Sequence, residues 1–224
     1  GDQYKTVAEV SGNESVMRIS GTQFRQLLQS GQPIPDWFSY PGVIKQLRSI
    51  TPPLNKRGFT VFFTGLSGAG KSTLAKALMA KLLEKLNRPV TLLDGDLVRD
   101  NLSSELGFSK AHRDINIKRI GFVAAEITKH RGIAICAPIA PYKEVRDLVR
   151  KSVEQYGGFI QVYLSTPLAE CERRDTKQLY QKARSGELKG FTGIDDPYEQ
   201  PKASEVVLDT SDQSIEACVD IILN

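Results

Sequence analysis

The chain has 224 residues, 40% of them hydrophobic and 25% charged, which suits one globular domain of ordinary size with at most a small appendage. Its 30 basic and 26 acidic residues give a net charge of +4, spread along the chain rather than gathered in a tail, and this balance does not distinguish an anionic small molecule from a nucleic acid as partner. No run approaches the roughly 18 apolar residues of a membrane span, so we expect no membrane partner. The three cysteines lack disulfide or zinc-site spacing, so we expect a cytoplasmic protein with buried, reduced thiols.

The N-terminal segment, residues 1–50, predicts two short helices. Ser20 with Gln23 forms a capping-box pattern at the start of the first helix, which a glycine and a proline end. Pro41 can open the second helix, because proline is well tolerated in a first turn. Two such helices cannot enclose a core alone, so we expect them to pack on the rest of the chain or to be the remnant of another domain. A proline- and glycine-bearing linker follows at 51–58.

From residue 59 onward the sequence alternates short apolar runs with helical patterns, which is typical of a parallel sheet with crossover helices. The expected strands are residues 59–64, 90–94, 132–138, 159–165 and 205–210. Apolar residues at three- and four-residue spacing predict helices over 72–86 and 112–130. We therefore expect a three-layer α/β domain over 59–224, a parallel sheet flanked by helices, behind a short helical extension.

The stretch "GLSGAGKST" (65–73) directly follows the first expected strand and opens a helix, which is the context of a phosphate-binding P-loop. Its glycines let backbone N–H groups converge on phosphate oxygens. Lys71 can reach the β- and γ-phosphates of ATP or GTP, and the Ser72 hydroxyl can bind Mg²⁺. The alternative is a glycine-rich turn with an accidental lysine, which this context disfavours. The residues expected to bind nucleotide here are Gly65, Ser67, Gly68, Ala69, Gly70, Lys71, Ser72 and Thr73.

Two carboxylates, Asp94 and Asp96, follow the second expected strand in "LLDGDLVRD" (92–100). Ligands of open α/β sheets bind at this edge, so one carboxylate can hold the magnesium shell while the other accepts a proton from an attacking hydroxyl. Arg99 is near enough in the sequence to hold an anionic group. The alternative is an ordinary surface turn, which the preceding P-loop disfavours.

Polar and basic residues recur along the next expected helix. Arg113, Asn116 and Arg119 span an arc of roughly 120°, so two or three of them can face one anionic ligand. Phe108, in the preceding loop, could stack on a purine. The alternative for the helix is a solvated basic face, and the alternative for Phe108 is an ordinary aromatic residue of the core.

A basic helix running into a glycine-punctuated loop over 171–195 predicts a lid that closes over a triphosphate and excludes water. Gly190 and Gly193 would give hinge freedom around Phe191. A merely solvated helix is the alternative. The basic residues of this expected lid are Arg173, Lys177, Lys182, Arg184 and Lys189.

Together these motifs resemble the adenylylsulfate kinase family, whose members use ATP to phosphorylate the 3′-hydroxyl of adenosine 5′-phosphosulfate (APS). The resemblance covers the chain from about residue 56 to the end. It rests on five matches in the family's order and spacing: "GLSGAGKST", "LDGD" with Arg99, "LGFS" with Arg113 and Asn116, "RDTKQLY" and "KGFTGIDDPYE". The resemblance implies a P-loop kinase fold, Mg²⁺ with ATP, direct in-line transfer and a homodimer.

The resemblance also implies roles for individual residues. Phe108 and Phe191 would sandwich the adenine of APS, and Asp96 would accept a proton from the reacting hydroxyl or orient it. The adenine of ATP would lie near Gln213 to Cys218. The residues expected to bind APS are Asp94, Asp96, Arg99, Phe108, Arg113, Asn116, Ile139, Ala140, Lys177, Gly190 and Phe191. The residues expected at ATP beyond the P-loop are Arg173, Gln213 and Cys218. The residues expected at Mg²⁺ are Ser72 and Asp94.

Two departures from the family pattern matter. Many members read Ser-Pro-Tyr where this chain has Ala140-Pro141-Tyr142, and that serine has been proposed as a phosphorylated intermediate. Alanine has no hydroxyl, so no such intermediate can form here, although Ile139 and Ala140 would still line the pocket through backbone groups. Gln178 replaces the glycine of the family's "KGLY", a change in local flexibility but not in charge.

Residues 19–48 are similar to the C-terminal end of ATP sulfurylase, the enzyme that makes APS and is fused to the kinase in some organisms. The chain therefore resembles the C-terminal part of such a fusion, with a fused or associated sulfurylase as partner. The sulfurylase's His-x-x-His and Gln-x-Arg-Asn motifs are absent, and the sequence's two histidines are His112 and His130. We expect no sulfurylase activity from it.

Other functions stay open at this point. A P-loop kinase for a nucleoside, a nucleotide or shikimate would share the P-loop and lid but would not require the "LGFS", "RDTKQLY" and "KGFTGID" set. A nucleotide-binding regulatory module of a sulfurylase would not need an intact Lys71, Ser72 and Asp96. A nucleic-acid partner is disfavoured, because positive charge gathers around the predicted nucleotide sites rather than along a stripe.

Overall fold

A computed structural model describes residues 17–224, and the chain divides into two compact units, Gly1–Lys56 and Arg57–Asn224. Residues 1–16 of the expected N-terminal segment lie outside the described part. The boundary between the units falls inside the expected linker, 51–58. No helix within residues 17–224 combines the length and apolar character needed to cross a membrane.

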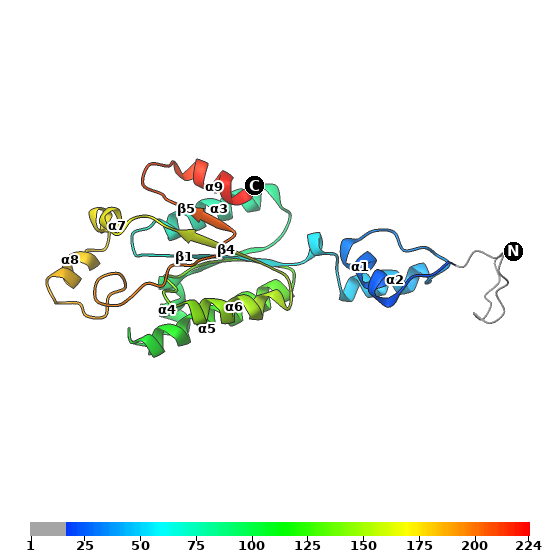
Figure 1. Cartoon of the computed structure of the whole chain (residues 1–224), viewed down its shortest axis with the longest axis horizontal. Coiled ribbons are helices and arrows are strands. Elements are labelled where there is room, and N and C mark those ends of the chain that lie inside the picture. The colour runs from blue at the N-terminus through cyan, green and yellow to red at the C-terminus, as the bar shows by residue number, and fades with distance from the viewer. Residues whose placement is uncertain (1–16) are drawn as a thin grey trace. The chain divides into compact units, whose positions relative to one another are not determined.

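The N-terminal unit contains the two predicted helices, α1 (Gly21–Ser30) and α2 (Pro41–Ile50), and a short 3-10 turn at Leu54–Lys56 (Figure 1). The capping box is confirmed: the Ser20 hydroxyl accepts from the Gln23 backbone N–H at 3.1 Å, and the Gln23 side chain accepts from the Ser20 N–H at 2.8 Å. The buried residues of this unit are Leu28, Ile34 and Ile44. Aromatic and aliphatic side chains of both helices and of the loop between them surround this cluster, so α1 and α2 pair through it.

The larger unit is built on a five-stranded parallel sheet, in the order β2-β3-β1-β4-β5, within the described residues. Its strands are β1 (Phe59–Gly65), β2 (Val90–Asp94), β3 (Ile133–Ala137), β4 (Gly158–Leu164) and β5 (Val206–Leu208). All five predicted strands are confirmed, with β5 shorter than expected. The buried β3 has no exposed residue, as a strand covered on both faces requires.

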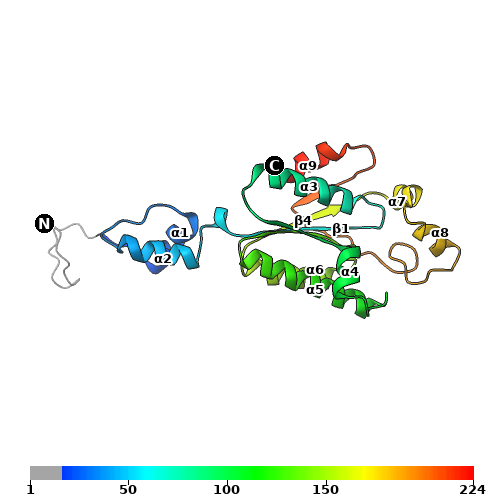
Figure 2. The same ribbon diagram turned by 180° about the vertical axis from the view of Figure 1, so that it is seen from behind.

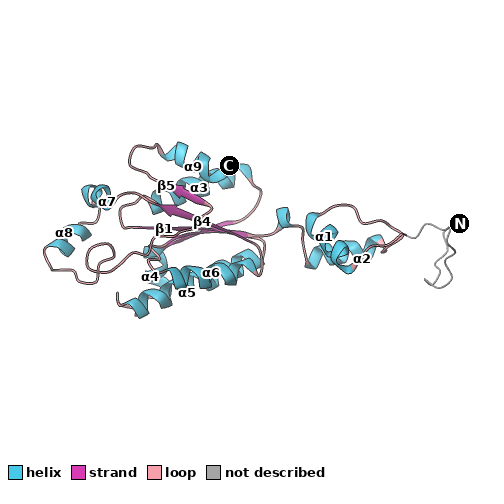
Figure 3. Ribbon diagram, in the orientation of Figure 1, coloured by secondary structure: helices cyan, strands magenta, loops and turns pink. Residues whose placement is uncertain are grey.

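Helices cover both faces of this sheet (Figures 1 and 2). The helices α3 (Lys71–Lys85) and α9 (Ile215–Leu223) lie on one face, and α4 (Gly95–Leu102), α5 (Lys110–Lys129) and α6 (Lys143–Glu154) on the other. Figure 3 shows the strands between these two layers. One buried apolar cluster lies on each face, so the predicted three-layer arrangement is confirmed. The three cysteines are free and buried, as the sequence predicts.

Two local elements differ from the expectation. The residues after β2 begin the helix α4, which is not among the expected helices, and the Asp94 side chain accepts the Asp96 N–H at 3.2 Å as its N-cap. The expected basic helix is two short helices, α7 (Leu168–Arg174) and α8 (Leu179–Arg184). Between them Gln178 has a φ of 55°, a left-handed conformation that suits the glycine it replaces in the family pattern.

Gly58 gives a test of how closely β1 approaches α5. A Cβ at this position would lie 2.2 Å from the Thr128 carbonyl oxygen and 2.6 Å from that of Gly132, both on the backbone. We expect Gly58→Ala to lower the free energy of unfolding in urea by about 1–3 kcal/mol, as overpacked sites do. Gly95→Ala, whose Cβ would meet nothing nearer than 3.5 Å, is the matched control and should stay near wild type. Equal stability of the two variants would contradict the close approach.

Candidate functional site

The P-loop connects β1 to α3 at the carboxyl edge of the sheet, and glycines are required at three of its positions. Gly65, Gly68 and Gly70 have φ values of 150°, 76° and 95°. A Cβ on Gly65 would lie 2.7 Å from the Leu164 carbonyl oxygen, and a Cβ on Gly68 would lie 2.9 Å from another backbone oxygen. Side chains would therefore displace the loop from the first turn of α3, whose N–H groups face the phosphate position.

Lys71 is the buried cation of the site, with only 8% of the residue exposed. Its ammonium donates to the carbonyl oxygens of Gly65 at 2.9 Å and Leu66 at 2.6 Å. Burial lowers the pKa of Lys71 to about 8, against the opposing effect of nearby Asp94 and Asp96. The charged form is thus poorly solvated before any anion arrives, which favours binding of phosphate.

The carboxylates predicted at the end of β2 take different positions. Asp94 caps α4, whereas the Asp96 side chain is 73% exposed and forms an ion pair with Lys177. Lys177 lies between α7 and α8, in the expected lid. Asp94, Asp96 and Lys177 all act electrostatically on Lys71, so these four groups, predicted from three separate motifs, lie at one site.

Arg99 and Arg113 extend this cluster toward the loop that precedes α5. Burial and the charge of Arg113 both lower the pKa of Arg99, which also feels Asp96. The Arg99 guanidinium lies 4.6 Å from the centre of the Phe108 ring and donates to the carbonyl of Leu106 at 2.9 Å. Two cations near enough for one to lower the pKa of the other suit an anionic ligand.

Arg113 joins the loop before α5 to the loop that carries Phe191. Its Nε donates to the Phe108 carbonyl at 2.7 Å, its other nitrogens contact the Gly190 carbonyl and the Thr192 hydroxyl, and Nη1 lies 3.3 Å from the Asp196 carboxylate. The guanidinium is therefore held by the protein rather than free in solvent. This arrangement places Phe108 and Phe191 on two loops tied by one side chain.

The other predicted residues of this region differ in exposure. Phe108 is 60% exposed, whereas Phe191 is buried with its ring edge-on to Tyr180, at 5.0 Å between centroids. Asn116 is buried, and its Oδ1 has no hydrogen-bond partner within residues 17–224. Arg119 pairs with Glu105 at 2.6 Å, whereas Arg113 pairs with Asp196, so the two arginines have different partners. An unpaired buried oxygen is costly, so Asn116 is suited to a donor from a ligand or water.

Ile139 and Ala140 follow β3, and their carbonyl groups already have partners. The Thr64 hydroxyl donates to the Ile139 oxygen at 2.7 Å, and Arg146 donates to the Ala140 oxygen at 2.7 Å. Ala140 has a φ of 46° and is buried. These bonds fix the backbone that follows β3 beside the P-loop strand.

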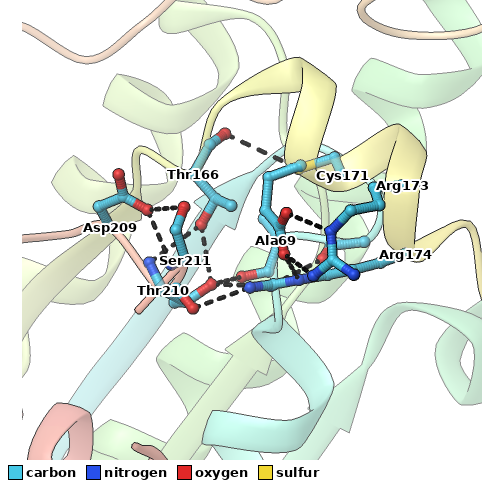
Figure 4. A network of polar contacts seen from close by, with 10 residues as sticks. Ala69, Thr166, Cys171, Arg173, Arg174, Asp209, Thr210 and Ser211 are labelled. Carbon is cyan, nitrogen blue, oxygen red and sulfur yellow. Dashed lines mark hydrogen bonds and ion pairs between the residues drawn. The ribbon is translucent and has the colours of Figure 1, made fainter. Parts of the chain in front are cut away.

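The residues predicted at ATP beyond the P-loop differ in exposure. Arg173 is 73% exposed on its side chain and pairs with Glu170 at 2.7 Å. Gln213 is exposed, whereas Cys218 is a buried residue of α9 (Ile215–Leu223) and donates to the Gln213 oxygen at 3.4 Å. The neighbouring Arg174, which sequence reasoning missed, reaches the P-loop instead (Figure 4). Its only sequence signal is its place in the basic segment that predicts the lid.

A magnesium ion fits the donors present. No group of three or more His, Cys, Asp or Glu side chains within residues 17–224 could hold a metal alone. Ser72 is half-buried in the first turn of α3, and Asp94 acts electrostatically on the adjacent Lys71. One hydroxyl and one carboxylate are hard oxygen donors, and Mg²⁺ commonly binds through one or two such groups together with phosphate oxygens and water.

Family models match both parts of the chain. The model described as adenylylsulphate kinase matches residues 57–209, and the model described as ATP-sulfurylase matches residues 2–50. A sulfate adenylyltransferase of Phaeosphaeria nodorum is 50% identical over 222 residues, which are 99% of this chain and 39% of that protein. The chain thus spans about two fifths of the length of the curated relatives it matches.

Solved structures with the same fold agree with these matches. The hexameric APS kinase from Thiobacillus denitrificans is 49% identical with a TM-score of 0.78, over 96% of this chain and 38% of that one. The Mycobacterium tuberculosis APS kinase CysC, solved in complex with AMPPNP and APS, is 43% identical with a TM-score of 0.71. That similarity covers 75% of this chain and 96% of the other.

Proposed function

The chain belongs to the adenylylsulphate kinase family, and we propose that it transfers the γ-phosphoryl group of ATP to the 3′-hydroxyl of APS. The products are 3′-phosphoadenosine 5′-phosphosulfate and ADP, a step of sulfate activation. The observation that carries the proposal is the convergence of Lys71 with Asp94, Asp96 and Lys177 beside the P-loop. A related kinase was solved with both an ATP analogue and APS, which supports these two substrates.

In this proposal the P-loop binds the phosphates of ATP. Its N–H groups and Lys71 would contact the β- and γ-phosphates and stabilise the charge that develops during transfer. Ser72 and Asp94 would hold Mg²⁺, which neutralises phosphate charge when bound. Arg173 stays a prediction for the lid over the triphosphate, and Gln213 and Cys218 stay predictions for the adenine end of ATP.

The acceptor site would lie around Asp96. Its carboxylate would accept the proton of the 3′-hydroxyl or orient that hydroxyl in line with the γ-phosphate, and it forms an ion pair with Lys177. Arg99, Arg113 and Asn116 would bind the phosphosulfate end of APS, with Phe108 and Phe191 at its adenine. Transfer would be direct, because Ala140 has no hydroxyl to carry a phosphoryl group.

The N-terminal unit is proposed to be the end of a sulfurylase domain. Residues 1–50 would belong to that domain, 51–58 would be the linker and 59–224 the kinase. The relatives that match both parts are much longer than this chain, which supports a fused sulfurylase as partner. We also propose a homodimer, by analogy with the family.

The test is an ADP-release assay with ATP and Mg²⁺, run with APS and, in parallel, with AMP, adenosine and shikimate. We expect release only with APS, and mass spectrometry should find the new phosphate at the 3′-position. Transfer to another acceptor would replace the proposed substrate. ATP binding without transfer to any acceptor would favour a regulatory module of the sulfurylase.

The affinity for ATP is expected to fall as the pH rises above 8. Burial lowers the pKa of free Lys71 to about 8, and bound phosphates favour its charged form. Binding then takes up a proton at higher pH, which weakens affinity by at most about tenfold per pH unit. Calorimetric titration with AMPPNP from about pH 7 to pH 9.5 measures this dependence. Lys71→Arg keeps its charge throughout, so an equally steep fall in that variant would exclude Lys71 as the source.

A further inference from the structure

Three consecutive carbonyl groups in the middle of the P-loop accept hydrogen bonds from side chains more than 100 residues further along the chain. The bonds run from the Tyr180 hydroxyl to the Ser67 oxygen at 2.9 Å, from Arg174 Nη1 to the Gly68 oxygen at 3.3 Å, and from the Thr210 hydroxyl to the Ala69 oxygen at 3.1 Å. The N–H and C=O of a trans peptide group point in opposite directions. Donors that hold these oxygens outward therefore turn the N–H groups of Gly68 and Gly70 toward the phosphate position, whereas the N–H of Ala69 donates to the Leu66 carbonyl at 3.2 Å.

We propose that Tyr180, Arg174 and Thr210, here called the P-loop buttress, position the P-loop for phosphate binding. The inference rests on the proposed function only in taking ATP as the natural ligand. None of the three residues needs to touch the nucleotide, so they are positioning residues. Their effect on a ligand passes through the backbone of residues 67–69.

Two residues of the buttress, Arg174 and Thr210, are themselves held in place by further bonds (Figure 4). Arg174 donates to the Glu170 carboxylate at 2.7 Å, to the Thr210 hydroxyl at 2.9 Å and to the Thr210 carbonyl at 2.8 Å. The buried Thr166 hydroxyl lies 2.9 Å from that of Thr210 and accepts the Thr210 N–H at 3.2 Å. A guanidinium with four partners keeps one rotamer, so the carbonyl of Gly68 meets a fixed donor.

Tyr180 connects the buttress to the expected lid. It is 2% exposed on α8, and its ring packs edge-on against Phe191. Substitution by phenylalanine keeps this ring contact and removes only the hydroxyl that reaches Ser67. Tyr180→Phe therefore separates the hydrogen bond from the packing of the lid.

The experiment compares Tyr180→Phe and Thr210→Val with the unchanged chain by calorimetric titration with two probes, inorganic pyrophosphate and MgAMPPNP. Each variant loses one hydrogen bond to a P-loop carbonyl, so we expect both probes to bind about 3- to 10-fold more weakly. Thr60→Val is the matched control, because it removes a buried hydroxyl bonded to Thr128 at 2.8 Å elsewhere in the sheet. Thermal melting is followed for every variant, and Thr60→Val should lower Tm without changing either affinity.

The outcomes separate this inference from the proposed function. Unchanged pyrophosphate affinity in both buttress variants would overturn the inference. If only MgAMPPNP bound more weakly, the inference would also be overturned, because that result would place these residues at the nucleoside. A wild-type chain that binds neither probe overturns it as well. Failure to phosphorylate APS, with pyrophosphate binding that falls in the variants, would sink the proposed function and leave the buttress supported.

Discussion

Lys71→Met is expected to lower kcat by about 10²- to 10³-fold, the range seen when one preorganised donor to a developing charge is removed. Lys71 is the buried cation beside the P-loop, and methionine keeps much of its length without the ammonium. The loss should fall on kcat more than on KM for APS, because the charge it stabilises lies on the transferring phosphoryl group. Steady-state kinetics at saturating ATP, with APS varied, measures both constants.

The control for Lys71→Met is Lys76→Met, an exposed lysine on the same helix, which should stay within about twofold of wild type. A second readout comes from stability. The folded-state pKa of Lys71 is about 8, below its ordinary 10.5, so the unfolded chain binds more protons between these values. Stability therefore rises with pH across that window in wild type, and Lys71→Met should lack this contribution. A variant that retains kcat within tenfold would remove Lys71 from the transfer step.

The parts of the fold that the sequence predicts well depend on local signals. The strands carry continuous apolar runs, and the P-loop has glycines at positions whose φ values or close neighbours exclude a side chain. The capping box at Ser20 is equally local and is confirmed. In each case the residues that determine the local structure lie within one helix or strand, or within the turn next to it.

The site was predicted less completely because its contacts join distant segments. Arg173 and Arg174 differ by about 100° on a helix, and only the start of α7 after Pro167 determines which of them faces the P-loop. Phe191 is buried by Tyr180, a contact that no periodicity in the loop indicates. Helix spacing predicts Arg113 as a ligand contact, whereas its bonds to Gly190 and Thr192 require the fold of a loop more than 70 residues away.

Asp96→Asn is expected to lower kcat by about 10²- to 10⁴-fold, the contribution typical of a general base. Asparagine keeps the shape of the side chain but cannot accept the proton of the 3′-hydroxyl, and it also ends the ion pair with Lys177. The position stays open to solvent in the free protein, so folding should be little affected. Single-turnover phosphorylation of APS, followed by quenched-flow sampling, measures the transfer step directly.

The matched control is Asp100→Asn, an exposed aspartate four residues further along α4, which makes the same change of charge and should keep kcat within about twofold. Lys177→Met tests the ion pair separately: it leaves the carboxylate in place, so its effect on kcat should be smaller than that of Asp96→Asn. If Asp96→Asn instead transfers at a rate within tenfold of wild type, the hydroxyl needs no protein base, and the carboxylate serves only to orient it. In that case the main sources of catalysis would be the positioning of the substrates and the charges of Lys71 and the P-loop. A loose transition state of phosphoryl transfer makes this possible, because the hydroxyl then needs little deprotonation.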